Sequence, residues 1–189
     1  MEKIFKGKTV LLGVTGCIAA YKSAEIISKL NYYGANVQVI MTKNACEFIT
    51  PLTLETLSKN LVVTDMFANK RTWEVEHISL AQKADICLIA PATANVIGKV
   101  SNGIADDMLT TTIMAIPDST PVVFAPAMNT NMYNNAIVQN NIKTLKSYDK
   151  YYFVEPANGR LACGDIGKGK LAKVDTIVEF VAEILNKEW

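Results

Sequence analysis

The sequence predicts an α/β fold in which helices cover both faces of a doubly wound parallel sheet. Short, nearly continuous apolar runs rich in β-branched residues recur along the chain, which is typical of strands buried on both faces. Segments with helical periodicity separate these runs. The chain has 189 residues and is 50% hydrophobic, so it can bury the core of one such domain. We therefore expect a single domain over residues 1–189.

The first strand and the first helix are predicted within residues 8–34. KTVLLGVT at 8–15 is apolar and β-branched, and the helical pattern at 18–33 ends at Gly34, a residue type that commonly closes helices. Basic residues ahead of this run also give it the look of a short secretory leader that ends at Cys17. We expect the strand, because the apolar stretch is short for a leader and the α/β alternation continues beyond it.

Four more strands and three more helices are predicted in alternation. The strands are ANVQVIMT at 35–42, DICLIAP at 85–91, TPVVFAPA at 120–127 and KYYFVEP at 150–156. The helices cover 107–115, 135–147 and 174–185. No stretch of the sequence reaches the roughly 18–20 apolar residues that a membrane span needs. We therefore expect no membrane partner.

Charge and cysteine content argue against several classes of protein. The chain has 19 basic and 18 acidic residues, and this balance does not predict a basic surface for nucleic acid. Four widely spaced cysteines and a single histidine do not form a metal-binding pattern, so we expect no metal site. The cysteine pattern favours a reducing, cytoplasmic compartment.

Small and polar residues gather where the predicted strands end. In doubly wound sheets the ligand binds in the crevice beyond the carboxyl ends of the strands. The segments that follow the five strands are GVTGC, MTKNA, PATAN, PAMNTNMYNN and GRLACGDIGKGK. A packed core does not require such residues at every strand end. We therefore expect a small-molecule site along this edge.

GVTGC suits either a phosphate or a tight backbone turn. Backbone N–H groups at the start of the following helix can hold an anion, and Thr42 and Lys43 could add a hydroxyl and a charge. Gly13 and Gly16 could equally serve only a sharp turn. The stretch matches neither the dinucleotide fingerprint nor a loop ending in GK[ST], so both interpretations stay open.

Two further stretches place amides beside small residues. In PATAN, Thr93 or Asn95 can cap a helix, whereas small side chains would also let a flat ring approach the backbone. In PAMNTNMY, Asn129 can present an amide to a carboxylate or an amide in the crevice. Asn134 and Asn135 are better explained as an Asx turn that begins a helix.

His77 and Cys163 are the two candidates for proton transfer. His77 is the single histidine; it stands at a predicted helix start just after Glu74 and Glu76, which could raise its pKa, although a lone histidine is more often structural. Cys163 lies among glycines 159, 164, 167 and 169, which we expect to act as hinges. No second cysteine or phosphate-loop pattern accompanies it. The segment is therefore interpreted as a lid that carries an acid and closes over the substrate.

GCIAAYK, His77, PATAN, PAMNTNMY and ACGDIGKG, in this order, resemble the homo-oligomeric flavin-containing cysteine decarboxylases over nearly the whole chain. PATAN is similar to the family motif PASANT, with Thr93 for serine and Val96 for the last threonine. PAMNTNMY is similar to PxMNxxMW, with Tyr133 for tryptophan. The resemblance implies a flavodoxin/Rossmann-like fold with the flavodoxin strand order.

The resemblance also implies that FMN binds between the subunits of a homo-oligomer, a trimer or a trimer-based dodecamer. The implied FMN contacts are Gly16, Cys17, Ile18, Thr42, Lys43, Asn44, Thr93, Ala94, Asn95, Val96 and Ala127. His77 and Cys163 match catalytic residues. Asn129 matches the amide that holds the substrate carboxylate, and Ala162 and Gly164 match a mobile substrate clamp around Cys163.

The ACGD segment resembles the branch of the family that decarboxylates 4'-phosphopantothenoylcysteine to 4'-phosphopantetheine in coenzyme A biosynthesis. The implied lyase reaction passes through a thioaldehyde and an enethiolate, with FMN taking and returning a hydride. Peptidyl-cysteine decarboxylases share the histidine and asparagine motifs, and flavin prenyltransferases share the fold and FMN. A non-catalytic FMN-binding regulatory subunit could keep the flavin motifs while losing His77 or Cys163.

Overall fold

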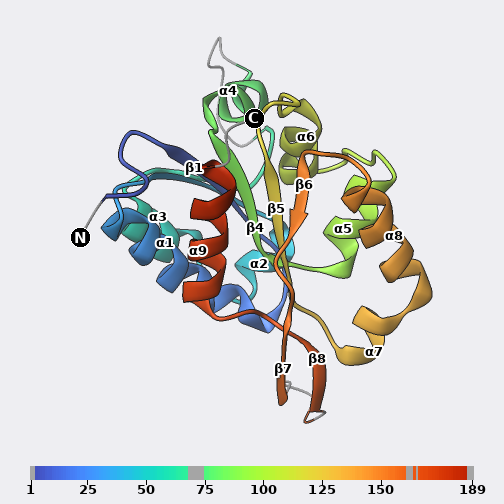
Figure 1. Ribbon diagram of the computed structural model, residues 1–189. Coiled ribbons are helices and arrows are strands. Elements are labelled where there is room, and N and C mark those ends of the chain that lie inside the picture. Colours follow the sequence, from blue (N-terminus) through green and yellow to red (C-terminus); the bar gives the residue numbers. More distant parts are fainter. Residues whose placement is uncertain (1–2, 68–74, 161–163, 165, 187–189) are drawn as a thin grey trace.

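A six-stranded parallel sheet forms the centre of the computed structural model, which describes residues 3–67, 75–160, 164 and 166–186 (Figure 1). The strand order is β3-β2-β1-β4-β5-β6. The strands are β1 (Thr9–Val14), β2 (Asn36–Met41), β3 (Val62–Val63), β4 (Ile86–Ala92), β5 (Val122–Pro126) and β6 (Tyr151–Phe153). The five predicted strands take the order β2-β1-β4-β5-β6, which is the predicted flavodoxin order, and β3 extends it to the 3-2-1-4-5-6 order of Rossmann sheets. The short edge strand β3 was not predicted.

Alternate residues of the central strand β1 face two separate apolar layers. Val10, Leu12 and Val14 belong to one buried cluster, whereas Leu11 belongs to the other. This alternation follows from the period-2 geometry of a strand, and it requires helices on both sides of the sheet. The doubly wound prediction is therefore confirmed by the core itself.

Helices cover both faces, as the sequence predicts (Figure 1). One face carries α1 (Ser23–Tyr32), α3 (Pro51–Ser58) and α9 (Val174–Leu185), and the opposite face carries α5 (Ala94–Ser101), α6 (Met108–Ala115) and α8 (Ala136–Lys146). The remaining helices are η1 (Ile18–Lys22), α2 (Lys43–Cys46), α4 (Glu76–Lys83) and α7 (Thr130–Asn134). No helix in the described ranges is long and apolar enough to cross a membrane.

The predicted helix boundaries agree closely with these ranges. The predicted helix at 18–33 is a 3-10 turn, η1, continued by α1, and Gly34 ends it with φ +94°. Asp107 caps α6 and Asn135 caps α8, each at the residue where the sequence places the helix start.

An antiparallel ribbon extends beyond the main sheet (Figure 1). It consists of β7 (Ala157–Arg160) and β8 (Ile166–Lys170). The sequence predicts a lid here but not its strands. Residues 161–163 and 165, which fall between β7 and β8 in the sequence, lie outside the described residues, and they include the predicted Ala162 and Cys163.

Candidate functional site

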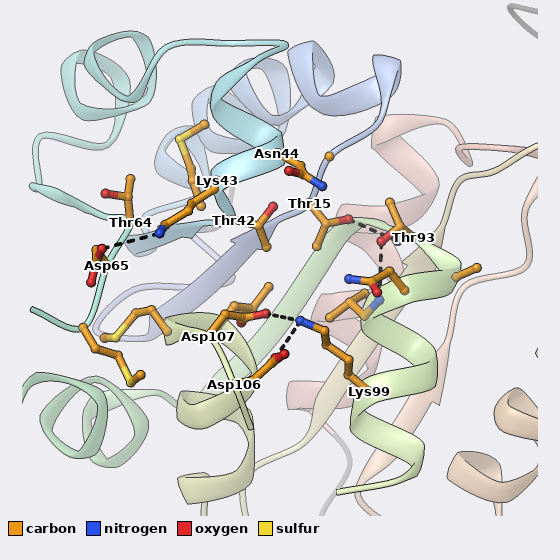
Figure 2. A pocket seen from close by; sticks show the side chains of 18 of the residues that line it. Thr15, Thr42, Lys43, Asn44, Thr64, Asp65, Thr93, Lys99, Asp106 and Asp107 are labelled. Atoms are coloured by element: carbon orange, nitrogen blue, oxygen red, sulfur yellow. Dashed lines mark hydrogen bonds and ion pairs between the residues drawn. The ribbon is translucent and has the colours of Figure 1, made fainter. Parts of the chain in front are cut away.

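Thr15 joins the carboxyl ends of β1 and β4. Its side chain is buried, and its hydroxyl donates to the Pro91 carbonyl at 2.7 Å. The same oxygen accepts from the N–H of Thr93 at 3.1 Å; Figure 2 shows Thr15 and Thr93 side by side. One hydroxyl therefore fixes the start of α5 relative to the loop that follows β1. Nothing in the sequence pattern singles out this role, because it depends on two segments 76 or more residues apart.

The loops that carry the predicted flavin contacts make tight turns or lead into helices whose first residues are capped. The Thr42 hydroxyl accepts from the Ala45 N–H at 3.2 Å, and the Thr93 hydroxyl accepts from the Val96 N–H at 3.4 Å. Thr93, and not Asn95, is therefore the cap of α5. A Cβ on Gly16 would lie 2.4 Å from the Cβ of Asn44, so the loop after β1 must have glycine there to meet the loop after β2.

These loops surround a cavity of about 610 Å³, called here the first cavity (Figure 2). Eight of the eleven predicted flavin contacts line it, namely Gly16, Thr42, Lys43, Asn44, Thr93, Ala94, Asn95 and Val96. The structure thus brings together three segments that are far apart in the sequence. The volume of the first cavity lies within the range of about 300–1,000 Å³ that small-molecule and cofactor sites occupy.

A charged cluster that the sequence does not predict lines the same cavity. Lys99 Nζ lies 2.6 Å from Asp106 Oδ1 and 2.8 Å from Asp107 Oδ2 (Figure 2). Burial opposes ionisation of Asp107, but hydrogen bonds from Lys99 and from the Thr110 N–H outweigh it and lower the pKa of Asp107. Asp107 also caps α6 through Thr110. The cluster therefore ties α5 to the start of α6.

A second cavity, of about 420 Å³, contains the other predicted contacts. Cys17, Ile18, Ala127 and Asn129 line it. The Asn129 Oδ1 accepts from the Asn131 N–H at 2.8 Å and begins α7. An Asx turn therefore explains part of the role of Asn129, while its place in the cavity agrees with the prediction that it faces a ligand.

The base of the ribbon packs against the segment that carries Asn129. The Met128 N–H donates to the Gly169 carbonyl at 2.9 Å. A Cβ on Gly169 would lie 2.4 Å from the Met128 carbonyl oxygen, and one on Gly167 would lie 2.6 Å from Thr130 Oγ1. These two glycines therefore permit close packing, a role that the sequence analysis did not predict for them. Gly164, with φ +93° and nothing within 4 Å of a Cβ position, retains the freedom that a hinge needs.

His77 is separated from the other predicted site residues. It is the second residue of α4, half-buried, and it lines neither cavity. In Figure 1, α4 lies toward the end of the sheet opposite the ribbon. One chain therefore brings together the predicted cofactor and carboxylate contacts but does not place His77 beside them.

Comparison with known proteins identifies relatives over almost the whole chain. The profile of the Flavoprotein family matches residues 2–186. The coenzyme A biosynthesis bifunctional protein CoaBC of Bacillus subtilis is 48% identical over 185 residues, which cover 98% of this chain and 45% of that protein. The probable phosphopantothenoylcysteine decarboxylase of Streptococcus mutans is 45% identical over 178 residues, covering 94% of this chain and 99% of that protein. The chain spans less than half the length of its bifunctional relatives.

Comparison with solved structures identifies proteins of the same kind. A mutant PPC decarboxylase complexed with pantothenoylaminoethenethiol superposes with a TM-score of 0.88 at 31% identity, covering 95% of this chain and 99% of that one. The FMN binding protein AtHal3 superposes with a TM-score of 0.85, also at 31% identity, with 96% and 98% coverage. The resemblance inferred from the sequence motifs is thus confirmed at the level of family and fold.

Proposed function

The chain belongs to the Flavoprotein family, and from this premise we propose that it is an FMN-dependent carboxy-lyase. Its proposed substrate is 4'-phosphopantothenoylcysteine and its product 4'-phosphopantetheine, in coenzyme A biosynthesis. The observation that carries the proposal is the first cavity, where eight predicted flavin contacts from three separate strand ends meet. The Streptococcus mutans relative, matched over 99% of its length, supports the choice of substrate.

The chemistry of the first cavity fits FMN. Polar groups at residues 15–16 and 42–44 suit a phosphate and a ribityl chain, while Met41, Met108 and Leu109 supply apolar surface for a ring. Gly16 leaves the backbone bare beside Asn44, where a side chain would fill the space. When bound, FMN would accept and return a hydride, and so supply the electron sink that the substrate carboxylate lacks.

Asn129 is proposed to hold the substrate carboxylate. The hydrogen bond from the Asn131 N–H to its Oδ1 fixes which side of the amide carries the Nδ2 donors. Hydrogen-bond donors are what a carboxylate requires, and an amide supplies them without a charge. The neighbouring ribbon packs on Met128 and Thr130 through its glycines, so the base of the ribbon lies beside this amide.

His77 and Cys163 are proposed to move protons. The clamp around Cys163, with Ala162 and Gly164, would exclude water while the thiol protonates the decarboxylated substrate. Because His77 lines neither cavity of its own chain, we also propose a homotrimer in which a second copy completes the site. The proposal treats residues 1–189 as one FMN-binding decarboxylase domain that works in the cytoplasm.

An anaerobic assay tests the proposed function. The FMN-loaded protein is mixed with 4'-phosphopantothenoylcysteine, and carbon dioxide, product and flavin absorbance are followed. We expect the wild type to release carbon dioxide and form 4'-phosphopantetheine. Cys163→Ser should still release carbon dioxide but accumulate the decarboxylated enethiol with the flavin colour bleached, because the final protonation is blocked. Wild-type protein that binds FMN but leaves this substrate intact would contradict the proposal. A C-terminal cysteine peptide, run in parallel, tests peptidyl-cysteine decarboxylation.

A further inference from the structure

Glu155 joins two lysines that come from separate elements. It lies between β6 and β7, where the chain leaves the main sheet for the ribbon. Lys168 Nζ, in the middle of β8, lies 2.7 Å from Glu155 Oε2, and Lys146 Nζ, at the end of α8, lies 3.3 Å from Glu155 Oε1. The hydrogen bond from Lys168 has the largest influence on the pKa of Glu155; together with Lys146 it outweighs burial and lowers that pKa. One ionised carboxylate therefore ties the ribbon to a helix of the main layer.

The ammonium group of Lys168 also lies over the ring of Tyr133 in α7. Its Nζ is 5.4 Å from the ring centroid, within the distance of about 6 Å over which a cation and an aromatic ring attract each other. Tyr133 is buried, and its N–H donates to the Asn129 carbonyl at 2.9 Å. Asn129 is the cap of α7. The contacts that begin at Glu155 therefore reach the short helix that the proposed carboxylate contact begins.

The residues on either side of Lys168 have no side chain that could make such a contact. Gly167 packs against the Thr130 hydroxyl, whose oxygen is buried and has no hydrogen-bond partner among the residues that the structure describes. Gly169 accepts a hydrogen bond from the Met128 N–H. These glycines let β8 approach α7 closely. Side-chain contact between the middle of β8 and α7 therefore depends on Lys168.

We propose that Glu155 is a positioning residue for Asn129. Glu155 holds Lys168 over Tyr133, and this contact fixes the start of α7, and with it the Asn129 amide, against the ribbon. The inference rests on the proposed function, in which Asn129 binds the substrate carboxylate. Because the three charged side chains are partly exposed, their pairing adds little to global stability. Its effect is expected on ligand binding, where a displacement of about 1 Å can cost on the order of a hundredfold in rate.

The chain contains a matched control with the same geometry. Lys150 Nζ lies 3.1 Å from Asp118 Oδ1 and 5.4 Å from the centroid of the Tyr151 ring. These three residues line a third cavity at the amino ends of β5 and β6, and they line neither of the other two cavities. Asp118→Asn therefore breaks an ion pair beside a tyrosine without affecting the ribbon.

Hydrogen exchange of the FMN-loaded protein, followed by mass spectrometry, tests the positioning directly. Peptides that cover residues 128–135 should exchange on the order of threefold to tenfold faster in Glu155→Gln and in Lys168→Met, because the start of α7 loses its support. The double variant should exchange no faster than either single variant, since both substitutions remove the same contact. Asp118→Asn should match the wild type. Unchanged exchange in Glu155→Gln, or additive effects in the double variant, would overturn the inference.

Binding of two ligands tests the consequence for Asn129. Calorimetry on the FMN-loaded protein compares N-(4'-phosphopantothenoyl)alanine, which has the carboxylate but no sulfur to react, with the corresponding N-ethyl amide, which has neither. We expect the wild type and Asp118→Asn to prefer the carboxylate ligand and Asn129→Ala to lose this preference. Glu155→Gln should reduce the preference on the order of threefold to tenfold. Equal weakening of both ligands by Glu155→Gln, or an unchanged preference, would contradict the role in positioning, because a misplaced amide affects the carboxylate alone.

Failure of the proposed function gives a different pattern. A wild type that neither decarboxylates 4'-phosphopantothenoylcysteine nor prefers the carboxylate ligand would contradict the proposed substrate. Hydrogen exchange at residues 128–135 does not depend on the substrate, so it would still decide whether Glu155 holds this segment in place.

Discussion

Gly169 and Met128 hold the ribbon against the sheet through contact that only glycine permits. The Met128 N–H donates to the Gly169 carbonyl at 2.9 Å, and a Cβ on Gly169 would lie 2.4 Å from the Met128 carbonyl oxygen. Gly169 also has φ +143°, a conformation that other residues rarely adopt. The ribbon is thus positioned by packing at its base.

Gly169→Ala should therefore displace the ribbon. We expect a loss of about 1–3 kcal/mol in the free energy of unfolding, because both the conformation and the contact are unfavourable for alanine. Decarboxylation should fall on the order of tenfold to a hundredfold through misplacement of the clamp. Gly103→Ala is the control: Gly103 has φ +67° but nothing within 4 Å of its Cβ position. The Gly103→Ala variant should lose stability without a comparable loss of kcat. Equal kcat losses in the two variants would contradict the role of the contact.

Thr15→Val tests the link between the carboxyl ends of β1 and β4. The substitution keeps the shape but removes the hydroxyl that serves the Pro91 carbonyl and the Thr93 N–H. Two polar groups at a buried junction then lose their partner, which costs about 1–3 kcal/mol. Urea unfolding should show this loss, and FMN should bind more weakly to the variant. Thr111→Val is the control, because Thr111 bonds the Ala105 carbonyl on an exposed surface. Unchanged stability of Thr15→Val would show that the junction does not depend on the hydroxyl.

The strand pattern was predictable because a strand buried on both faces requires a nearly continuous run of apolar residues. The five longer strands are apolar runs, and Asp107 and Asn135 mark helix starts through ordinary capping chemistry. β3 was missed because two residues cannot show a period. IGKGK does not favour a strand by composition; β8 forms because its glycines fit against Met128 and Thr130.

The candidate site was predictable only in part, for a related reason. The position of a residue at the end of a strand can be inferred from the local sequence. The flavin contacts that line the first cavity were therefore predicted. Thr15 and the Lys99 cluster act through partners that only the folded chain brings near. Three cations line the second cavity, and Lys22 lies more than a hundred residues before Arg160 and Lys170, so no local charge run reveals them as a group. His77 lines neither cavity of its own chain, and its place in the proposed site depends on the proposed second copy.

Asp107→Asn should give a pH-dependent loss of stability. Asparagine can still cap α6, but the pairing with Lys99 is lost, so we expect a cost of roughly 0.5–1 kcal/mol at neutral pH. The pKa of Asp107 is lowered in the fold, so its contribution is present above the ordinary value of 3.8 and is lost as the pH falls through the lower folded value. Thermal unfolding at several pH values should therefore show wild type and variant converging in acid. A stability difference that stays constant down to the lowest pH tested would contradict this assignment.

Mixing two inactive variants tests whether a second copy completes the site. His77→Gln and Asn129→Ala should each abolish decarboxylation, because one removes the proton-transfer group and the other the carboxylate contact. If His77 serves the cavity of a neighbouring chain, unfolding and refolding a 1:1 mixture creates sites with both groups intact. Random assembly of a cyclic trimer predicts activity at about a quarter of the sites. The separately refolded variants provide the control. A mixture that assembles into trimers yet stays inactive would place His77 and Asn129 in the same chain's site, contrary to the separation of α4 from both cavities.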